Sequence, residues 1–385
     1  MQMSKVDIRY TVRYIEKDIL SYIKPNKAIV IYGPRRVGKT TLMRHIQAQL
    51  NEPSLWLEGE NLSVKEKLSS QRLDSLLDLI GSNRLIFIDE AQQVENIGIN
   101  LKILVDQVPG IKIIVSGSSS FELSKQVGEP LVGRKWQYYL YPLSQLELGR
   151  NQTPFESSQL LEERLVFGSY PEAVYAVDRK TKSTILESIV DGALFKDVFA
   201  LEGVKKPQKI VALTRLLALQ IGKQVSLSEL ANALDINLTT VERYLDLLEK
   251  TFVISRVFGF SRNLRKEITK TSRYYFWDNG VRNALINNFN SLNIRDDIGM
   301  LWENYLFIER QKKCRYQDIF TNSYFWRTHD RQEIDLVEER GGVLYGYEFK
   351  WSDKKVIAPR IWLETYPEAK FEVVNRQNFL SFIAG

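Results

Sequence analysis

The sequence is poor in the side chains that form disulfides and soft metal sites. It has one cysteine, Cys314, and two histidines, His45 and His329. A lone cysteine excludes an intramolecular disulfide and a thiolate metal cluster, which suits a reducing cytoplasm. Two histidines exclude a histidine-rich metal centre, so any bound metal is expected to be a hard cation with oxygen ligands.

Long apolar runs, internal repeats and low-complexity tracts are also missing. No uninterrupted apolar stretch is long enough to cross a membrane, and residues 1–10 are charged and lack the apolar centre of a signal peptide. We therefore expect a cytoplasmic protein with no membrane partner. A chain of 385 residues, 44% hydrophobic and 26% charged, should form roughly two or three domains. Its net charge of +6 permits nucleic-acid binding without requiring it.

The most informative segment is residues 28–50. Residues 33–40, GPRRVGKT, match the pattern G-x-x-x-x-G-K-[ST] at every fixed position, with a β-branched apolar run before them and a helix-forming run after them. In that context backbone N–H groups face phosphate oxygens, Lys39 reaches the β- and γ-phosphates of ATP, and Thr40 offers its hydroxyl to Mg²⁺. A chance glycine turn is the alternative, and the flanking strand and helix signals oppose it. The predicted nucleotide-binding residues are Gly33, Pro34, Arg35, Arg36, Val37, Gly38, Lys39, Thr40 and Thr41, although the side chains of Arg35 and Arg36 fill variable positions and receive no ligand role.

Two carboxylates follow the next strongly apolar run, residues 85–88. Ligands bind at the carboxyl ends of parallel strands, where Asp89 and Glu90 would lie. We expect Asp89 to hold Mg²⁺ through water and Glu90 to act as the catalytic residue that polarises the attacking water. Taken alone, an apolar run before Asp-Glu is often only a strand end, but downstream of a phosphate-binding loop it favours hydrolysis.

Two further positions are candidates for sensing the γ-phosphate. A third apolar run, residues 111–115, leads into serines, and the hydroxyl of Ser118 could contact the nucleotide; a turn rich in small residues is an equal alternative. Arg134 could be a sensor or an arginine finger for a neighbouring subunit of a homo-oligomer; a surface arginine is an equal alternative.

Strands and helices alternate at first, and the pattern later becomes mostly helical. This order predicts an α/β protein with a P-loop NTPase core, an AAA-like parallel sheet, followed by three further parts. The predicted segments are an N-terminal lead-in helix (1–26), the P-loop ATPase core (27–142), a helical lid (143–206), a winged helix-turn-helix (207–278) and a C-terminal α/β domain (279–385).

The predicted winged helix begins its first helix with a capping box, Ser226 to Glu229, and a hairpin of residues 252–258 and 274–277 follows the second helix. The second helix presents mostly acidic side chains outward, which disfavours a groove-reading role. The hairpin loop instead carries the candidate nucleic-acid contacts Arg262, Arg265, Lys266, Lys270 and Arg273. A basic loop could contact a DNA backbone without reading its sequence. A protein-interaction winged helix with a solvated basic loop is an equal alternative.

The C-terminal part predicts three strands, residues 323–326, 332–337 and 343–349, with Gly341-Gly342 as a two-residue hairpin loop. In that register Asp335 lies opposite Glu348 and Glu333 opposite Lys350, and all four side chains share one face. Opposed carboxylates repel unless a cation lies between them, and Lys350 could position a water. A preceding helix carries Glu303. The alternative is a solvent face on which Lys350 neutralises Glu333.

The whole chain resembles a prokaryotic family of AAA-type P-loop ATPases with a C-terminal domain of uncharacterised function. The phrases that carry the resemblance are residues 33–41 (GPRRVGKTT), 87–92 (FIDEAQ), 116–119 (SGSS), 133–134 (GR), 141–144 (YPLS), 168–172 (GSYPE), 276–280 (FWDNG), 302–304 (WEN), 333–335 (EID) and 348–350 (EFK). The resemblance implies an ATPase core, a winged helix and a domain similar to the PD-(D/E)XK nuclease fold.

Within that fold, the resemblance places Asp335, Glu348 and Lys350 at the catalytic Asp and E-x-K positions, with Glu303 as an assisting acid. Glu303, Asp335 and Glu348 are thereby implied metal ligands. Two departures are Ile334, which replaces a proline before Asp335, and the bulky Phe349 inside the E-x-K motif. We therefore expect an ATPase that uses ATP and Mg²⁺ and acts on DNA. The alternative is an ATP-driven signalling or assembly switch whose nuclease-like domain is an inactive protein-interaction module.

Overall fold

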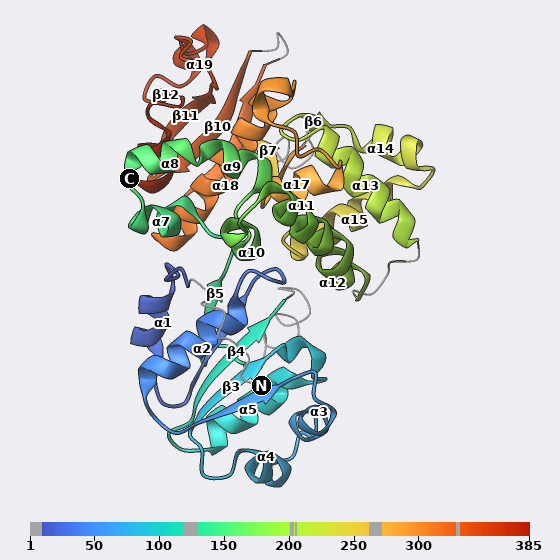
Figure 1. The fold of residues 1–385 in the computed structure, drawn as a ribbon, viewed down its shortest axis with the longest axis vertical. Helices are drawn as coiled ribbons and strands as arrows, with labels where there is room; N and C mark the ends of the chain where they lie inside the picture. The colour runs from blue at the N-terminus through green and yellow to red at the C-terminus, as the bar shows by residue number, and fades with distance from the viewer. Residues whose placement is uncertain (1–9, 119–129, 201–203, 205, 262–271, 329–331) are drawn as a thin grey trace.

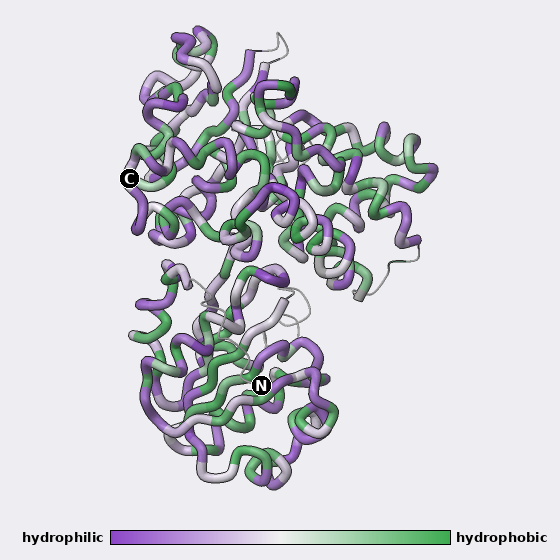
Figure 2. Tube along the Cα trace, viewed as in Figure 1, coloured by the Kyte–Doolittle hydropathy of each residue, from purple (hydrophilic) through white to green (hydrophobic). Residues whose placement is uncertain are grey.

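The computed structural model describes residues 10–118, 130–200, 204, 206–261, 272–328 and 332–385, which form two lobes (Figure 1). The N-terminal lobe holds one sheet, and the C-terminal lobe holds a second sheet with most of the helices. Hydrophobic residues run along the strands of the N-terminal sheet, as Figure 2 shows. Within the described ranges no helix is both long and apolar enough to cross a membrane.

The N-terminal lobe is built on a five-stranded sheet with the order β2-β3-β4-β1-β5, and every pairing in it is parallel. Its central strands are apolar and buried because helices cover the sheet, as is typical of parallel sheets. The predicted α/β lobe with a parallel sheet is confirmed. Its elements are α1 (Glu16–Tyr22), β1 (Lys27–Tyr32), α2 (Lys39–Leu50), β2 (Ser54–Glu58), α3 (Leu62–Leu68), α4 (Leu73–Ile80), β3 (Leu85–Asp89), η1 (Ala91–Gln93), α5 (Ile97–Gln107), β4 (Lys112–Gly117) and β5 (Lys135–Tyr139).

The strand order brings three loops to one edge of this sheet. Lys112 at the start of β4 pairs with Lys27 of β1 and with Leu85 of β3, so the three strands run level with one another. The phosphate-binding loop, the end of β3 and the serines after β4 therefore meet at the carboxyl edge, where open α/β sheets bind ligands.

Short helices follow the N-terminal sheet and pack in the C-terminal lobe. The helix α9 contacts α17, and α10 leads into α11 (Figure 1). The elements up to the second sheet are α7 (Gln145–Leu148), η2 (Gly149–Asn151), α8 (Pro154–Gln159), α9 (Leu161–Phe167), α10 (Pro171–Tyr175), α11 (Arg179–Ser188), the π-helix η3 (Ile189–Leu194), α12 (Phe195–Ala200) and α13 (Pro207–Leu219).

The second sheet has seven strands in the order β12-β11-β10-β9-β7-β8-β6. The hairpin β7–β8, predicted as part of a winged helix, continues directly into the C-terminal strands, because β7 pairs in parallel with β9 at Phe258–Tyr324 and Gly259–Phe325. The strands on the two sides of the predicted boundary between residues 278 and 279 therefore belong to one sheet. The elements are β6 (Gln224–Val225), α14 (Leu227–Leu234), α15 (Leu238–Lys250), β7 (Ile254–Gly259), β8 (Ser272–Phe276), α17 (Asn279–Leu285), η4 (Leu292–Ile294), α18 (Ile298–Tyr316), β9 (Asn322–Arg327), β10 (Glu333–Arg340), β11 (Val343–Phe349), α19 (Arg360–Thr365), β12 (Lys370–Val374) and α20 (Phe379–Ala384).

The β10–β11 hairpin has the predicted register. Pairing runs from Leu336–Tyr347 to Arg340–Val343, and both loop residues, Gly341 and Gly342, have positive φ, 54° and 81°. Only glycine adopts two successive positive φ angles at little cost, which explains the Gly-Gly pair. On its other side β10 shifts register against β9 between Ile334 and Val337. This irregularity lies at Asp335, and such bulges often re-aim a side chain beside a site.

Candidate functional site

The phosphate-binding loop connects β1 to α2 in a conformation that depends on its glycines. Gly38 has φ 94°, and a Cβ on Gly33 would lie 2.1 Å from the carbonyl oxygen of Leu140. The Nζ of Lys39 donates hydrogen bonds of 2.9 Å to the carbonyl oxygens of Gly33 and Pro34. The lysine therefore lies folded against its own loop, from which it would turn to meet phosphate oxygens.

Asp89, at the end of β3, is joined to the loop and to β4 by hydroxyl groups. The Thr40 Oγ1 donates to Asp89 Oδ2 at 2.6 Å, and the Ser116 hydroxyl donates to Asp89 Oδ1. The hydroxyl of Thr40 and the carboxylate of Asp89 are oxygen ligands of the kind that Mg²⁺ prefers. The two predicted metal residues, Thr40 and Asp89, are thus in direct contact.

Glu90 belongs to a small network at the same edge. Its backbone has a positive φ of 51°, which turns the chain sharply after Asp89. The Gln92 Nε2 donates to Glu90 Oε2 at 2.6 Å and to Ser118 Oγ at 2.9 Å. The predicted catalytic carboxylate and the predicted sensor serine are therefore bridged by one amide side chain.

A pocket of about 720 Å³ lies over the loop. Its size is within the usual range for small-molecule sites, about 300–1,000 Å³. It is bounded by the loop and Glu90, by the chain before α1, and by α10 with its flanking residues. The lining residues are Tyr10, Thr11, Arg13, Arg36, Val37, Gly38, Lys39, Thr40, Thr41, Glu90, Leu143, Pro171, Glu172, Tyr175 and Val177.

A buried ion pair fixes the wall of this pocket. The Arg13 Nε donates to Glu147 Oε1 at 2.9 Å, and Arg13 Nη1 donates to the carbonyl oxygen of Val37 at 2.7 Å. Glu147 also accepts a 2.9 Å hydrogen bond from the backbone N–H of Tyr14 and closes the capping box of α7 with Ser144. The pair thus ties the phosphate-binding loop to the N-terminal segment and to α7.

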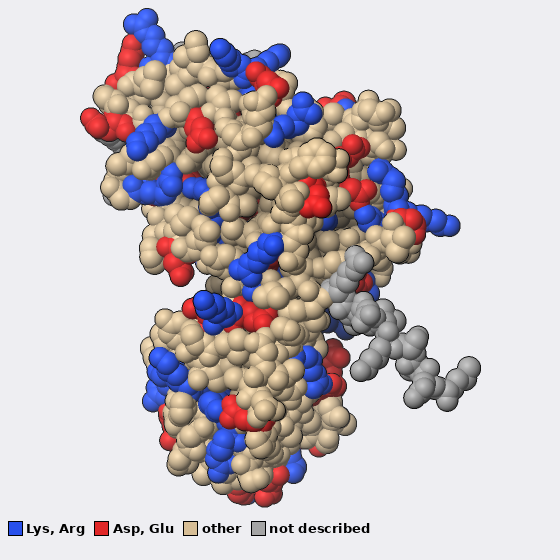
Figure 3. Space-filling model, turned by 60° about the vertical axis from the view of Figure 1, so that its left-hand side comes forward, with Lys and Arg blue, Asp and Glu red and all other residues tan. Residues whose placement is uncertain are grey.

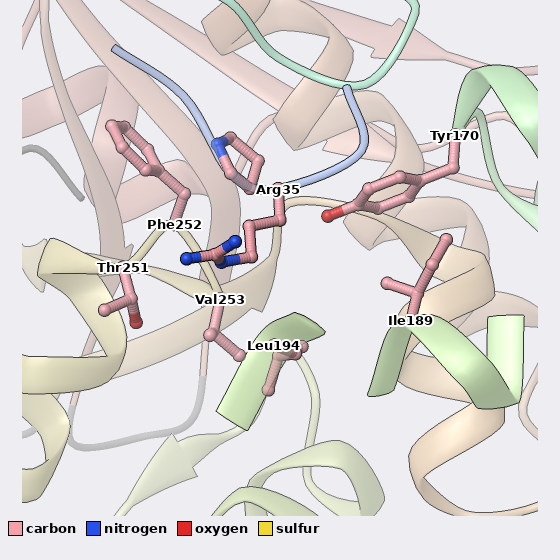
Figure 4. A pocket seen from close by; sticks show the side chains of 8 residues that line it. Arg35, Tyr170, Ile189, Leu194, Thr251, Phe252 and Val253 are labelled. Carbon is pink, nitrogen blue, oxygen red and sulfur yellow. The ribbon is translucent and has the colours of Figure 1, made fainter. Parts of the chain in front are cut away.

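Arg35 connects the loop to the C-terminal lobe (Figure 4). Its Nη1 lies 3.7 Å from Glu90 Oε2, and its side chain extends toward the turn after α15. The small cavity around it, about 10 Å³, is lined by Pro34, Arg35, Tyr170, Ile189, Leu194, Thr251, Phe252 and Val253. The Arg35 side chain therefore lies between Glu90 and the turn that connects α15 to the β7–β8 hairpin.

Arg134 does not reach the loop of its own chain. Its carbonyl oxygen accepts from Ala28 N at the amino end of β1, and its side chain binds Asp106. Five residues of strand separate Ala28 from Gly33, about 16 Å. Arg134 therefore lies far from the phosphate-binding loop of its own chain, and its roles as a sensor or as an arginine finger for a second copy stay predictions.

A second cluster of charged residues lies in the C-terminal lobe. Arg273 of β8 contacts Glu333 Oε2 at 2.9 Å, Glu303 Oε1 at 3.3 Å and Asp335 Oδ1 at 3.6 Å. The Lys350 Nζ donates to Glu348 Oε1 at 2.6 Å. The four residues that the resemblance implies, Glu303, Asp335, Glu348 and Lys350, are thus gathered, together with an arginine.

Burial dominates the electrostatics of this cluster. It raises the pKa of Glu303 to about 8 and the pKa of Glu348 to about 7, with the charge of Asp335 adding to both shifts. Burial also raises the pKa of Asp335, although the N–H of Phe349 and the charge of Arg273 oppose it. Across the residues described, no group of three or more His, Cys, Asp or Glu side chains is arranged to hold a metal ion.

The predicted basic loop is described only at its end. Arg262, Arg265, Lys266 and Lys270 lie outside the described residues. Arg273 is 3% exposed and packs among carboxylates, so its assignment as a DNA-backbone contact is wrong. The physical reason is that Arg273 lies within the paired part of β8, where its side chain contacts Glu303 of α18 and Glu333 of β10.

Sequence reasoning missed Gln92, Ser116 and Arg13. Gln92 carried a signal, because it lies two residues after Glu90. Ser116 carried a weaker one as the first serine after the third apolar run. Arg13 carried none, since its partner Glu147 lies 134 positions away.

Three families match successive parts of the chain. Residues 25–149 match the AAA domain, residues 158–292 a domain of unknown function (DUF8612), and residues 298–375 a domain of unknown function (DUF4143). The first match supports an AAA-type domain that binds ATP and has ATPase activity. The second match runs across the boundaries predicted at residues 206 and 278.

Curated relatives align along most of the chain. An uncharacterized protein of Mycobacterium tuberculosis is 28% identical over 326 residues, 84% of this chain and 70% of that protein. An uncharacterized protein of Methanocaldococcus jannaschii is 27% identical over 379 residues, 92% of this chain and 82% of that protein. Among solved structures, the Thermotoga maritima RuvB Holliday junction branch migration motor aligns with 64% of this chain and 90% of its own, at 16% identity and a TM-score of 0.33. So low a score supports no inference about function.

Proposed function

We propose that this chain is a Mg²⁺-dependent ATPase whose hydrolytic site lies at the carboxyl edge of the N-terminal sheet. Lys39 would neutralise the phosphates, and Thr40 and Asp89 would hold the metal, which supplies charge stabilisation when bound. Glu90 would accept a proton from the attacking water. The observation that carries the proposal is the network of Glu90, Gln92 and Ser118 beside a pocket of about 720 Å³.

The residues at this site suit magnesium and a triphosphate. Thr40 and Asp89 offer hard oxygen atoms 2.6 Å apart, and Lys39 can exchange two carbonyl partners for phosphate oxygens. The Gln92 bridge gives Ser118 a way to report on the γ-phosphate through Glu90. An arginine finger from a second copy would complete the charge balance, and Arg134, 41% exposed, is the candidate.

We further propose that hydrolysis drives action on DNA. Helices α13, α14 and α15 followed by the β7–β8 hairpin have the order of a winged helix, and Ser226 accepts from Glu229 N at the start of α14, one of the two hydrogen bonds of the predicted capping box. Both charge signs are interspersed over the face in Figure 3. The concentration of basic residues in the sequence between β7 and β8 is what supports a DNA contact there.

The competing proposal is an ATP-driven assembly switch whose C-terminal domain binds a protein. The pairing of β7 with β9 favours it, because a hairpin fixed in a seven-stranded sheet is less free to adapt to a DNA groove. The ATPase rate measured with and without single-stranded, duplex and branched DNA separates the two. Stimulation by DNA favours the first, and an unchanged rate favours the second.

Replacing Arg262, Arg265, Lys266 and Lys270 by alanine is expected to weaken DNA binding and to flatten its dependence on salt. Each lost phosphate contact removes about one unit from the slope of log K against log salt. The measurement is a fluorescence titration at several salt concentrations. The control removes the exposed lysines Lys354 and Lys355, and it should leave the slope unchanged. An unaltered slope in the loop variant would exclude this loop as the contact.

A further inference from the structure

The acidic cluster of the C-terminal lobe already contains a cation. The guanidinium of Arg273 faces three carboxylates, those of Glu333, Glu303 and Asp335, at 2.9, 3.3 and 3.6 Å. The Glu333 side chain is 44% exposed, whereas those of Glu303 and Asp335 are mostly buried. Arg273 thus supplies a positive charge beside Asp335, while Lys350 supplies one beside Glu348, 2.6 Å from its Oε1.

Arg273 is held in this position by its surroundings. It lies on β8, which pairs with β7 on one side and β6 on the other, and only 3% of it is exposed. Its guanidinium lies 4.7 Å from the centre of the Phe325 ring on β9, a cation–π contact. An arginine side chain keeps its charge at every physiological pH. Arg273 is therefore a permanent and nearly immobile positive charge.

The carboxylate oxygens that a metal would need are largely engaged. Asp335 Oδ2 accepts from Phe349 N at 2.9 Å and its Oδ1 faces Arg273, while Glu303 Oε1 accepts from the Tyr275 hydroxyl at 2.7 Å. Mg²⁺ and Mn²⁺ also need several oxygens in a close octahedral shell. A divalent ion on Asp335 would lie within a few ångströms of the guanidinium and be repelled by it.

Two buried atoms of the cluster have no hydrogen-bond partner, Arg273 Nε and Glu348 Oε2. Glu348 Oε2 is buried and has no hydrogen bond, although Glu348 as a whole is 7% exposed. A buried carboxylate oxygen without a donor is costly. It is the atom toward which a cation would be drawn if Arg273 were removed.

We propose that Arg273 takes the place of the divalent metal in the Glu303–Asp335–Glu348 cluster and keeps metal out of it. The C-terminal domain of the folded chain is then a metal-free scaffold that does not cleave phosphodiesters. Removing Arg273 unmasks a cation site made of Asp335 and Glu348. This proposal is independent of the ATPase assignment, because its test uses neither nucleotide nor the phosphate-binding loop.

The test measures the change in melting temperature that Mn²⁺ causes in the full chain without nucleotide. Four proteins are compared: the native chain, Asp335→Asn, Arg273→Ala and the double variant. We expect small and equal Mn²⁺ shifts in the native chain and in Asp335→Asn. Any shift that these two proteins share comes from metal bound at the phosphate-binding loop of the N-terminal lobe, so the comparison controls for it. Arg273→Ala should melt lower in chelator and rise by several degrees with Mn²⁺, and Asp335→Asn should abolish that rise.

Two results would overturn the proposal. One is a Mn²⁺ shift in the native chain that Asp335→Asn removes, since metal would then bind beside Arg273. The other is a folded Arg273→Ala protein that shows no Mn²⁺ response. If Arg273→Ala does not fold, Arg273→Gln removes the charge while keeping a donor for Glu303, and the same two readings apply to it.

Discussion

Replacing Glu90 by glutamine is expected to slow ATP hydrolysis by about 10²–10⁴-fold while ATP still binds. Glutamine keeps the length of the side chain, and Gln92 can still hold it, so the geometry at the strand end should persist. What is lost is the negative charge that accepts a proton from water. Phosphate release at saturating ATP measures the rate, and binding of a fluorescent ATP analogue measures affinity.

Lys39→Ala provides the contrast. Lys39 would meet the phosphate charge directly, so this variant should lose nucleotide binding as well as turnover. Exposed residues provide matched controls: Glu95→Gln, close to Glu90 in sequence, and Lys102→Ala on α5 should both turn over ATP at the native rate. Normal hydrolysis by Glu90→Gln would show that another group activates the water.

Glu147→Gln is expected to lower the stability of the fold by about 3–5 kcal/mol. Glu147 is fully buried and its partner Arg13 is 3% exposed, so the substitution leaves a buried guanidinium without its counter-charge. Glutamine can still close the capping box of α7, but its amide nitrogen then faces the Tyr14 N–H, so the loss combines the charge pair with that hydrogen bond. Because Arg13 also binds the Val37 carbonyl, nucleotide affinity should fall as well. Thermal melting and nucleotide titration measure the two effects.

Glu156 provides the control for this change. It closes an equivalent capping box with Thr153 on α8 but is solvent-exposed, so Glu156→Gln should leave the melting temperature nearly unchanged. Equal losses in the two variants would contradict the role assigned to the Arg13 pair.

The same pair sets a pH dependence. Burial, the largest single influence, raises the pKa of Glu147, but the attraction and hydrogen bond of Arg13 together with the N–H groups of Ser144 and Tyr14 outweigh it, so the pKa is lowered. A carboxyl with a lowered folded pKa adds stability that is complete above its ordinary pKa and disappears as pH falls through the folded value. The difference in melting temperature between the native chain and Glu147→Gln should therefore shrink below about pH 4. A difference that stays constant through that range would exclude the ion pair as its cause.

Local sequence patterns were enough to predict those parts of the fold that residues close in sequence determine. The glycine loop, the Ser226 cap and the β10–β11 register depend on spacings of a few residues, and the structure has all three. Local patterns also predicted that Thr40, Asp89 and Glu90 lie at one edge of the sheet, because parallel strands end at the same edge.

Long-range contacts were beyond such patterns. Arg273 reads as the last member of a basic run, and only the packing of β8 against α18 and β10 shows that it is buried among acids. The pairing of β7 with β9 joins Phe258 to Tyr324 without any local signal. The distance of Arg134 from the loop of its own chain was likewise beyond local patterns, because it follows from the pairing of Lys135, at the start of β5, with Ala28 of β1.

The continuous seven-strand ladder also decides how this protein can be taken apart. A fragment that ended at residue 278 would leave β7 as an open edge, and one that began at residue 279 would leave β9 open. Open edges offer unpaired N–H and C=O groups to other chains and promote aggregation. Expression of the C-terminal segment alone should therefore yield insoluble material. A cut between β5 and α7 breaks no strand pairing, but it separates Arg13 from Glu147.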